Sequence, residues 1–348
     1  MSTRVRSFSK INLGLAVGPA RPDGFHGLAT MYQTLALHDF VTVEARAAAV
    51  TKITLTSNHP GVPRTETRNA EKNTAFAMVA GALTRMGITA EVTIDIQKRL
   101  PVQGGMGAGS ANAVAALLGL ERELGRALPG SERLKLAAEV GSDVPLFLLG
   151  GSVLGLGRGE EVYPLPDTPA IPCVVAIPSV GVSTAQAFRD LDAKSEVREA
   201  SSASTLTFQQ PLDRLSELSR VLAAIWTIDG VESGPSGIAR PGFPDKQGNL
   251  AENPLLALVR TGIENDFEEV AFSQHPSLRS TKRDLMGSDS GGSALYAALS
   301  GSGSALFGLY ESQADARAAQ QRVQQSGTQA ILTETLPRSA YWDTMFAE

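Results

Sequence analysis

The stretch PVQGGMGAGSANAVAALLGLERELG, residues 101–125, places four glycines and an alanine within the six positions 104–109 and then continues as an alanine-rich helical pattern to about residue 124. The residues before it, AEVTIDIQKRLP at 90–101, alternate apolar and polar side chains and predict a strand. A strand that leads through glycines into a helix is typical of anion-binding loops, because the first helical turn leaves N–H groups unpaired and carries partial positive charge. We expect this turn to hold a phosphate, with a tight turn that binds nothing as the alternative.

The spacing within this stretch excludes two common phosphate-binding loops. A Walker A loop, GxxxxGK[ST], requires a lysine after its last glycine, and no lysine follows these glycines. The dinucleotide fingerprint GxGxxG fits at Gly105 and Gly107, but Ser110 occupies the position of its third glycine. Glycine lets the backbone approach a phosphate closely, and Ser110 can add a hydroxyl donor. The loop is therefore expected to be a phosphate cradle of another kind.

The composition is that of an ordinary globular protein with room for two domains. The chain has 348 residues, of which 43% are hydrophobic and 19% charged, and its formal net charge is −5. It holds no cluster of Lys and Arg, so we expect neither a nucleic acid nor an anionic membrane as a partner. Residues 1–10 lack the apolar core of a signal peptide, and no apolar run is long enough to span a bilayer.

Cysteine and histidine usage indicates a reducing compartment and gives no sign of a metal site. Cys173 is the only cysteine, which rules out an internal disulfide, and its apolar neighbours in PCVVAIP (172–178) predict a buried strand residue. The four histidines have no metal-ligand spacing, so no metal ligands are assigned. We expect a cytoplasmic enzyme or binding protein that acts on small molecules.

Two further segments carry the signals that start and end helices. Residues 74–86 follow a helical pattern that Asn73 can cap and Gly87 can end. The segment SERLKLAAEVG, residues 131–141, is predicted to be another capped helix. Strand patterns precede and follow these helices, so the chain is expected to be an α+β protein.

The strand and helix patterns are interrupted near residues 165–170, within YPLPDTPAIP. We therefore expect an N-terminal domain at 1–168 and a C-terminal domain at 169–348. Residues of about 194–250 are rich in Ser, Pro, Gly and polar side chains and read as an insertion in the second domain. No role is assigned to that insertion beyond a surface segment.

Three glycine-containing motifs, in order along the chain, resemble the signatures of the GHMP kinases, the family of galactokinase, homoserine kinase and mevalonate kinase. They are SFSKINLGLAV (7–17), PVQGGMGAGSANA (101–113) and LSGSGSALFGLY (299–310). The resemblance implies a two-domain GHMP kinase fold, with an N-terminal domain like domain 2 of ribosomal protein S5 and a C-terminal ferredoxin-like α/β sandwich. It also implies ATP as co-substrate, bound by the loop residues Pro101, Val102, Gln103, Gly104, Gly105, Met106, Gly107, Ala108, Gly109, Ser110 and Ala111.

Lys10 and Asp143 are the candidate catalytic residues. Lys10 lies in an otherwise apolar strand, where a lysine either extends its ammonium to the surface or pairs with an acid. Asp143 follows the helix end at Gly141, where a capping role is the alternative. The resemblance makes Asp143 the general base and Lys10 its partner, which keeps the carboxylate ionised. It also implies Mg²⁺, held mostly by phosphates and water with Ser110 as a contact, because the sequence has no dedicated carboxylate cage.

The stretch SKINLGLAVGPARPDGFHGLATMYQTLALHD (9–39), with its RPDGFH, resembles the GHMP kinases that act on a cytidine-diphosphate-linked methylerythritol. This implies transfer of the γ-phosphoryl group of ATP to a secondary hydroxyl of that substrate. Phe25 would stack on the pyrimidine and His26 would read its edge. Asn12 would hydrogen-bond the substrate, and Phe188 would be the opposite face of the sandwich or, alternatively, a core residue.

Two other readings keep part of this picture. A homoserine- or mevalonate-type kinase would share the fold, but RPDGFH argues against it. A non-catalytic nucleotide-binding relative would not need both Lys10 and Asp143. The sequence departs from the family pattern at Ala108 and Ala111, which stand where Gly and Ser are frequent, and at Phe25, which stands for a frequent Tyr. The partners expected are the two small-molecule substrates, and the chain is expected to act as a monomer or homodimer.

Overall fold

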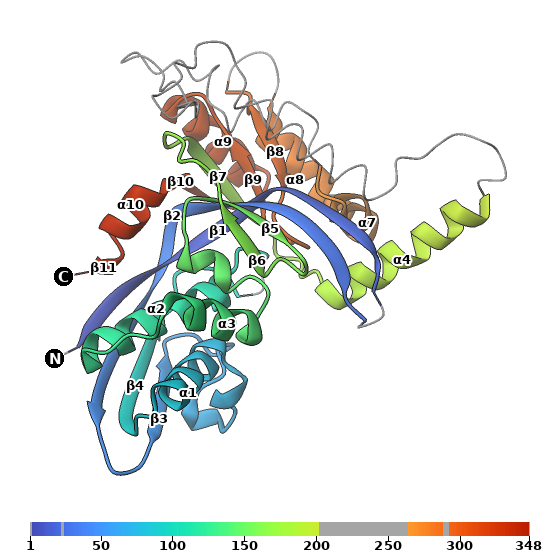
Figure 1. Ribbon diagram of the computed structural model, residues 1–348. Coiled ribbons are helices and arrows are strands. Elements are labelled where there is room, and N and C mark those ends of the chain that lie inside the picture. The colour runs from blue at the N-terminus through green and yellow to red at the C-terminus, as the bar shows by residue number, and fades with distance from the viewer. Residues whose placement is uncertain (1, 22–23, 103, 202–263, 288–291, 348) are drawn as a thin grey trace, which may run out of the picture.

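The computed structural model of the chain describes residues 2–21, 24–102, 104–201, 264–287 and 292–347. Within these ranges the chain forms two β-sheets with helices on the outer side of each (Figure 1). Gln103 and most of the predicted insertion at 194–250 lie outside the described residues, as do two residues of RPDGFH. The mixture of antiparallel sheets and packed helices is the α+β architecture that the sequence predicts.

The first sheet is built around two long strands, β1 (Thr3–Ala20) and β2 (His26–Ala47), which cross the whole molecule in Figure 1. In the described part of the chain its order is β11-β1-β2-β4-β3. Strand β5 pairs with the N-terminal half of β2, and β6 pairs with β5. All these neighbours are antiparallel except β3 and β4. The remaining strands are β3 (Lys52–Ser57), β4 (Ala90–Gln97), β5 (Ser152–Leu156), β6 (Glu161–Pro164) and β11 (Phe346–Ala347).

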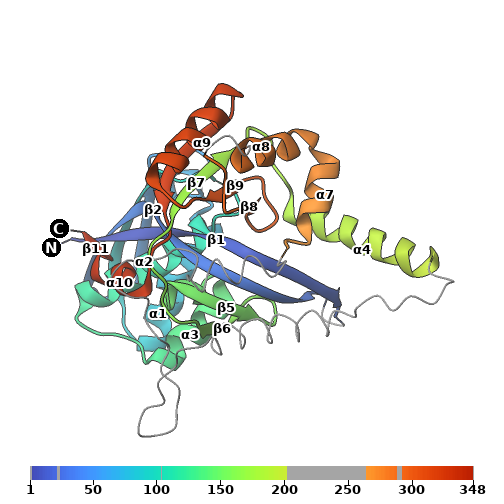
Figure 2. The ribbon, with the colours of Figure 1, turned by 90° about the horizontal axis from the view of Figure 1, so that it is seen from above.

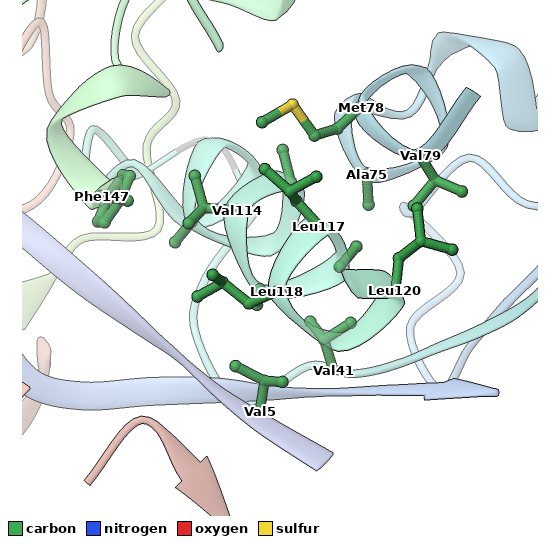
Figure 3. Packing of buried hydrophobic residues seen from close by; sticks show 14 of the residues in the cluster. Val5, Val41, Ala75, Met78, Val79, Val114, Leu117, Leu118, Leu120 and Phe147 are labelled. Atoms are coloured by element: carbon green, nitrogen blue, oxygen red, sulfur yellow. The ribbon is translucent and has the colours of Figure 1, made fainter. Parts of the chain in front are cut away.

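Three helices cover one face of this sheet: α1 (Thr74–Met86), α2 (Ala108–Leu124) and α3 (Gly130–Val140). Helix α2 is buried along most of its length between the sheet and α1 (Figure 3). Its small side chains make this possible, since a Cβ at Gly119 would lie 2.7 Å from Val43 Cγ2. Figure 3 shows Val5 and Val41 of the strands beneath α2 and Met78 of α1 beside it.

The predicted helix caps are confirmed for α1 and corrected for α3. The Asn73 side chain accepts a hydrogen bond from the N–H of Ala75 (2.9 Å), and Gly87 ends the helix in the left-handed region at φ 63°. Helix α3 begins at Gly130, directly after Pro129, so Ser131 lies inside the helix and does not cap it. Three short 3₁₀ turns complete this half: η1 (Thr65–Thr67), η2 (Ala70–Lys72) and η3 (Pro145–Leu148).

The second sheet has the antiparallel order β10-β7-β9-β8 in the described residues. Its strands are β7 (Pro172–Ile177), β8 (Tyr296–Leu299), β9 (Leu306–Leu309) and β10 (Gln329–Glu334). Its outer face is covered by α7 (Phe267–Gln274), α8 (Pro276–Met286) and α9 (Gln313–Gln325). Cys173 is fully buried in β7, as predicted. Helix α4 (Thr184–Ser201) extends away from the body of the molecule (Figure 2).

The two sheets pack against each other through a second apolar cluster. Ile11 and Leu13 of β1 and Met31 of β2 meet Val175 of β7 and Phe307 of β9 there, all of them buried. The order of layers is therefore helices, first sheet, second sheet, helices. Because β1 and β2 belong to both packing interfaces, side chains at the middle of β1 lie where the two halves of the molecule meet.

The end of the chain returns to the first sheet. Helix α10 (Arg338–Asp343) and strand β11 pack on the N-terminal half, with β11 paired to β1. Tyr341 donates a hydrogen bond to the carbonyl of Phe147 (2.6 Å), and the Arg338 guanidinium donates to three carbonyls, those of Gly150, Ser152 and Leu165. The closing residues 338–347, which the sequence assigned to the second domain, thus pack with the first. No helix among the described residues is long and apolar enough to cross a membrane.

Candidate active site

A cavity of about 470 Å³ lies at the glycine-rich loop, at the N-terminus of α2. Gly107 is the N-cap residue of the helix, and both Gly105 (φ 73°) and Gly107 (φ 67°) adopt the left-handed conformation that glycine favours. The loop backbone therefore lines the cavity at the N-terminal end of α2, where the N–H groups of the first helical turn have no partner within the helix. The cavity is lined by Gly61, Val62, Pro63, Lys72, Asn73, Thr74, Lys98, Pro101, Val102, Gly104, Gly105, Met106, Gly107, Ala108, Gly109, Ser110 and Asn112.

Most of the loop residues predicted to contact ATP line this cavity. Ala111 does not: its side chain is 2% exposed within the core, and its N–H donates to the carbonyl of Gly107 (2.9 Å). Ala111 therefore offers the cavity neither a side chain nor a free donor. Sequence reasoning missed Thr74, which lines the cavity at the start of α1 and donates to the carbonyl of Gly109 (2.6 Å). Its position one residue after a helix cap was the available signal.

Gly105 is required because a second glycine turn, residues 300–304, packs directly against the loop. A Cβ at Gly105 would lie 2.1 Å from the carbonyl oxygen of Ser300, far inside van der Waals contact. The Ser300 hydroxyl donates to the carbonyl of Gly105 (3.0 Å), and the N–H of Ala305 donates to the carbonyl of Gly104 (3.3 Å). The second and third glycine motifs of the sequence thus form one structure across the two halves of the molecule.

A buried ion pair fixes the backbone segment that precedes the glycine loop. Lys98, at the end of β4, pairs with Asp39 of β2, and the two side chains are 4% and 0% exposed. The same carboxylate accepts hydrogen bonds from the N–H groups of Arg99 (2.7 Å) and Leu100 (2.8 Å). Asp39 therefore holds the backbone that leads into Pro101. Sequence reasoning missed this pairing, because the partners are 59 residues apart.

The predicted pairing of Lys10 with Asp143 is confirmed. Lys10 Nζ lies 3.2 Å from Asp143 Oδ2, and the Lys10 side chain is 3% exposed while that of Asp143 is 33% exposed. The ammonium also donates to Asn12 Oδ1 (2.6 Å), whose Nδ2 donates to the hydroxyl of Thr30 (2.7 Å). A buried cation is thus held by a carboxylate and an amide, and the carboxylate alone reaches solvent.

The catalytic candidates adjoin the glycine turns. A Cβ at Gly107 would lie 3.0 Å from Lys10 Cγ, and a Cβ at Gly301 would lie 3.5 Å from Lys10 Nζ. The amide of Asn265 donates to the carbonyls of Leu299 (2.8 Å) and Gly301 (2.7 Å) and so fixes the second turn. The Lys10–Asp143 pair therefore lies where the two glycine turns meet, next to the cavity.

Tyr32 is a member of this site that sequence reasoning missed. Its hydroxyl donates to Asp143 Oδ1 at 3.0 Å, and its side chain is 1% exposed. Burial raises the pKa of Tyr32 well above its ordinary value, and the nearby negative charge of Asp143 adds to the increase. The phenol therefore keeps its proton at neutral pH and donates a hydrogen bond to the carboxylate.

The aromatic residues predicted to bind the pyrimidine are arranged differently from the predicted sandwich. The rings of Phe188 and His26 are stacked, with centroids 4.8 Å apart and an interplanar angle of 21°, so Phe188 faces His26. His26 Nε2 lies 2.7 Å from Asp192 Oδ1, and Phe188 meets Phe267 edge-on. Phe25 is 49% exposed, and the Arg158 guanidinium lies 4.9 Å from its ring centroid. The structure thus joins Phe188 and His26 in one contact and leaves Phe25 open at the surface.

Metal-binding side chains do not gather in the part of the chain that the structure describes. No group of three or more His, Cys, Asp or Glu side chains there could hold a metal ion. The polar residues that line the cavity are Lys72, the Asp39-bound Lys98, Asn73, Thr74, Ser110 and Asn112. This donor set suits a phosphorylated ligand better than a bare cation.

Comparison with known proteins shows the family to which the chain belongs. The family model described as GHMP kinases N terminal domain matches residues 73–151, and the one described as GHMP kinases C terminal matches residues 250–329. A homoserine kinase from Cytophaga hutchinsonii has the same fold, with a TM-score of 0.64 at 19% identity over 97% of this chain and 96% of that chain. The fold and the glycine loop are those of a GHMP kinase.

Relatives at higher identity define the family more narrowly. A 4-diphosphocytidyl-2-C-methyl-D-erythritol kinase of Solibacter usitatus is 37% identical over 306 residues, 88% of this chain and 80% of the relative. One of Streptomyces avermitilis is 34% identical over 94% of each chain. A crystal structure of a 4-(cytidine 5'-diphospho)-2C-methyl-D-erythritol kinase matches with a TM-score of 0.64 at 25% identity, over 95% of this chain and 99% of that chain. The chain belongs to the 4-diphosphocytidyl-2-C-methyl-D-erythritol kinase family.

Proposed function

We propose that this chain transfers the γ-phosphoryl group of ATP to the 2-hydroxyl of 4-diphosphocytidyl-2-C-methyl-D-erythritol, giving the 2-phosphate and ADP, in the methylerythritol phosphate route to isoprenoid precursors. The observation that carries the proposal is the ion pair of Lys10 and Asp143 beside the glycine-loop cavity. The names of relatives at 34–37% identity supply the substrate. The reaction needs a phosphate cradle and a base next to it, and we assign these roles to the glycine loop and to Asp143.

Asp143 is the general base in this proposal. Its carboxylate is 33% exposed, so it can reach an acceptor hydroxyl, whereas Lys10 is buried behind it. As the hydroxyl oxygen attacks the γ-phosphorus, Asp143 accepts the hydroxyl proton, and the bond between that phosphorus and the β–γ bridging oxygen breaks to release ADP. The Lys10 ammonium holds the carboxylate in place and stabilises negative charge on the transferring group.

The glycine loop holds the phosphates of ATP. The N-terminus of α2 supplies N–H donors and partial positive charge, and the left-handed turns at Gly105 and Gly107 let the backbone approach the anion. Lys72, which also lines the cavity, adds positive charge. Mg²⁺ would be held by the phosphates and water, with the Ser110 hydroxyl at the start of α2 as its protein contact. When bound, this ion neutralises charge on the phosphates.

In this proposal the cytidine end of the substrate binds near the C-terminal end of β1 and the N-terminal end of β2. The exposed ring of Phe25 stacks on the pyrimidine, and the His26 imidazole reads its polar edge. Phe188 acts through His26, whose ring it stacks on. The Asn12 amide has a second hydrogen beyond the one given to Thr30, and this hydrogen is offered to the substrate. We further propose that the enzyme works in the cytoplasm as a monomer or homodimer.

Substitution of the candidate base tests the mechanism. With Asp143→Asn the carboxylate loses its basicity while its shape is kept, and we expect kcat to fall by about 10²–10⁴-fold, the usual contribution of a general base. Lys10→Met should have an effect of similar size. Glu121→Gln is the matched control, because Glu121 is also a buried carboxylate in an ion pair, with Arg133 at 2.7 Å, but is not among the residues that line the cavity. Near-normal turnover by Asp143→Asn would contradict the assignment.

A further inference from the structure

The carboxylate of Asp143 is held on both oxygens. Lys10 Nζ lies 3.2 Å from Oδ2, and the Tyr32 hydroxyl donates to Oδ1 at 3.0 Å. We propose that Tyr32 is a positioning residue for the reaction, which fixes the orientation of the Asp143 carboxylate. This inference rests on the proposed role of Asp143 as the base. It assigns a function to a residue that does not itself contact the reacting atoms.

The surroundings of Tyr32 are shaped to fit its phenol. Tyr32 lies on β2 opposite Val153 of β5, and the turn between β5 and β6 covers its ring. A Cβ at Gly155 would lie 2.5 Å from Tyr32 Cε2, and a Cβ at Gly159 would lie 2.5 Å from the Tyr32 hydroxyl oxygen. Both glycines belong to the LGLGRGE segment, 154–160. Any larger residue at either position would displace the phenol, so the glycines of this segment are needed to seat Tyr32 against Asp143.

The charges around Tyr32 and Asp143 keep the phenol as the donor and the carboxylate as the acceptor of their hydrogen bond. The groups that face Asp143 are Lys10 from β1 and Tyr32 from β2, and Glu160 from the β5–β6 turn adds negative charge near Tyr32. Glu160 itself is paired with Arg158 (3.2 Å). Burial and these negative charges favour the protonated phenol, so Tyr32 donates and does not act as a base.

One consequence follows for catalysis. A carboxylate held on both oxygens cannot rotate, so its remaining lone pairs stay aimed at the acceptor hydroxyl, which is the geometry that proton transfer requires. Loss of the phenol hydroxyl should therefore slow the chemical step. Substrate binding should change little.

Tyr32→Phe removes the hydroxyl and keeps the ring. We expect kcat at pH 7 to fall about 10-fold, as for the loss of one hydrogen bond to a charged group. KM for ATP and for the cytidine-linked alcohol should stay within about twofold, because ground-state contacts are kept. Tyr310→Phe is the matched control, since it loses an equally buried phenol hydrogen bond, to the carbonyl of Leu285 (2.9 Å), away from the site.

An unchanged kcat in Tyr32→Phe would overturn the inference. So would an equal fall of kcat in Tyr310→Phe, because the effect would then be one of general stability. If Tyr32→Phe did not fold, Gly159→Ala provides the second test: it keeps the tyrosine but pushes its hydroxyl away from Asp143, and kcat should fall while KM changes little. Asp143→Asn separates the two proposals. Full activity there refutes the base assignment, whereas an inactive Asp143→Asn beside a normal Tyr32→Phe refutes the role of Tyr32 alone.

Discussion

Gly105→Ala is the substitution that best tests how the glycine loop is built. Gly105 has φ 73°, and an alanine Cβ there would lie 2.1 Å from the Ser300 carbonyl oxygen and 3.1 Å from that of Gly303. Both neighbours are backbone atoms of the second glycine turn, so no side chain can rotate away. The left-handed conformation alone costs about 1–2 kcal/mol for an alanine. Overpacking against fixed backbone adds about 1–3 kcal/mol.

The expected loss in the free energy of unfolding is therefore about 2–5 kcal/mol, a large part of the roughly 5–15 kcal/mol that stabilises a typical domain. Gly125→Ala is the matched control, because Gly125 ends α2 at φ 60° and a Cβ there would meet no atom within 4 Å. Its loss of stability therefore reflects only the cost of the left-handed conformation for an alanine. The difference between the two variants isolates the contact of the loop with residues 300–304.

Urea unfolding of both variants measures the stability difference, and a coupled ADP-release assay measures KM for ATP. Gly105→Ala should raise this KM, because the displaced loop no longer presents its N–H groups to the phosphates, while Gly125→Ala should leave it unchanged. If the two variants lost equal stability and bound ATP equally well, the loop would not depend on the second glycine turn, and the reasoning would be refuted.

Three further predictions concern the loop, the core and the domain junction. Gly109→Ala should raise KM for ATP without loss of thermal stability, because its methyl would make only ordinary contact (3.6 Å from Thr74 Oγ1) yet would project at the phosphate cradle. Burial raises the pKa of the Cys173 thiol, so a thiol reagent such as DTNB should not label the native protein and should label one thiol after unfolding; rapid native labelling would contradict the burial. Burial lowers the pKa of His38, so the unfolded chain binds the extra proton first and stability should fall as the pH drops through about 6.5. His38→Gln should lose less stability than the parent between pH 7.5 and 5.5 in urea unfolding, and equal losses would count against this assignment.

Local patterns predicted the elements that carry the site. The cap at Asn73, the alternation of 90–97 and the glycines before α2 each depend on neighbours in the sequence, and each is found where the sequence places it. The pairing of Lys10 with Asp143 came from the resemblance and not from spacing, since 133 positions separate the residues. The ion pair in the structure confirms this prediction. The two residues can meet because β1 belongs to both packing interfaces of the molecule.

The features that sequence reasoning missed all depend on distant contacts. Tyr32 occupies an ordinary position in a buried strand, and only its packing under Gly155 and Gly159 brings it to Asp143. The ion pair of Lys98 with Asp39 joins the residue that follows β4 to the interior of β2 in the same way. The stacking of Phe188 on His26 joins the start of α4 to the start of β2, and alternation within either element carries no information about the other.

The acceptor alcohol is the central point to test. The purified protein would be incubated with Mg-ATP and, separately, with 4-diphosphocytidyl-2-C-methyl-D-erythritol, homoserine and mevalonate, with ADP release followed and the product examined by ³¹P NMR. We predict ADP release with the cytidine-linked alcohol alone, together with a new phosphomonoester on its 2-hydroxyl. Turnover of homoserine or mevalonate at a comparable rate, or no ADP release with the cytidine-linked alcohol, would contradict the proposed function.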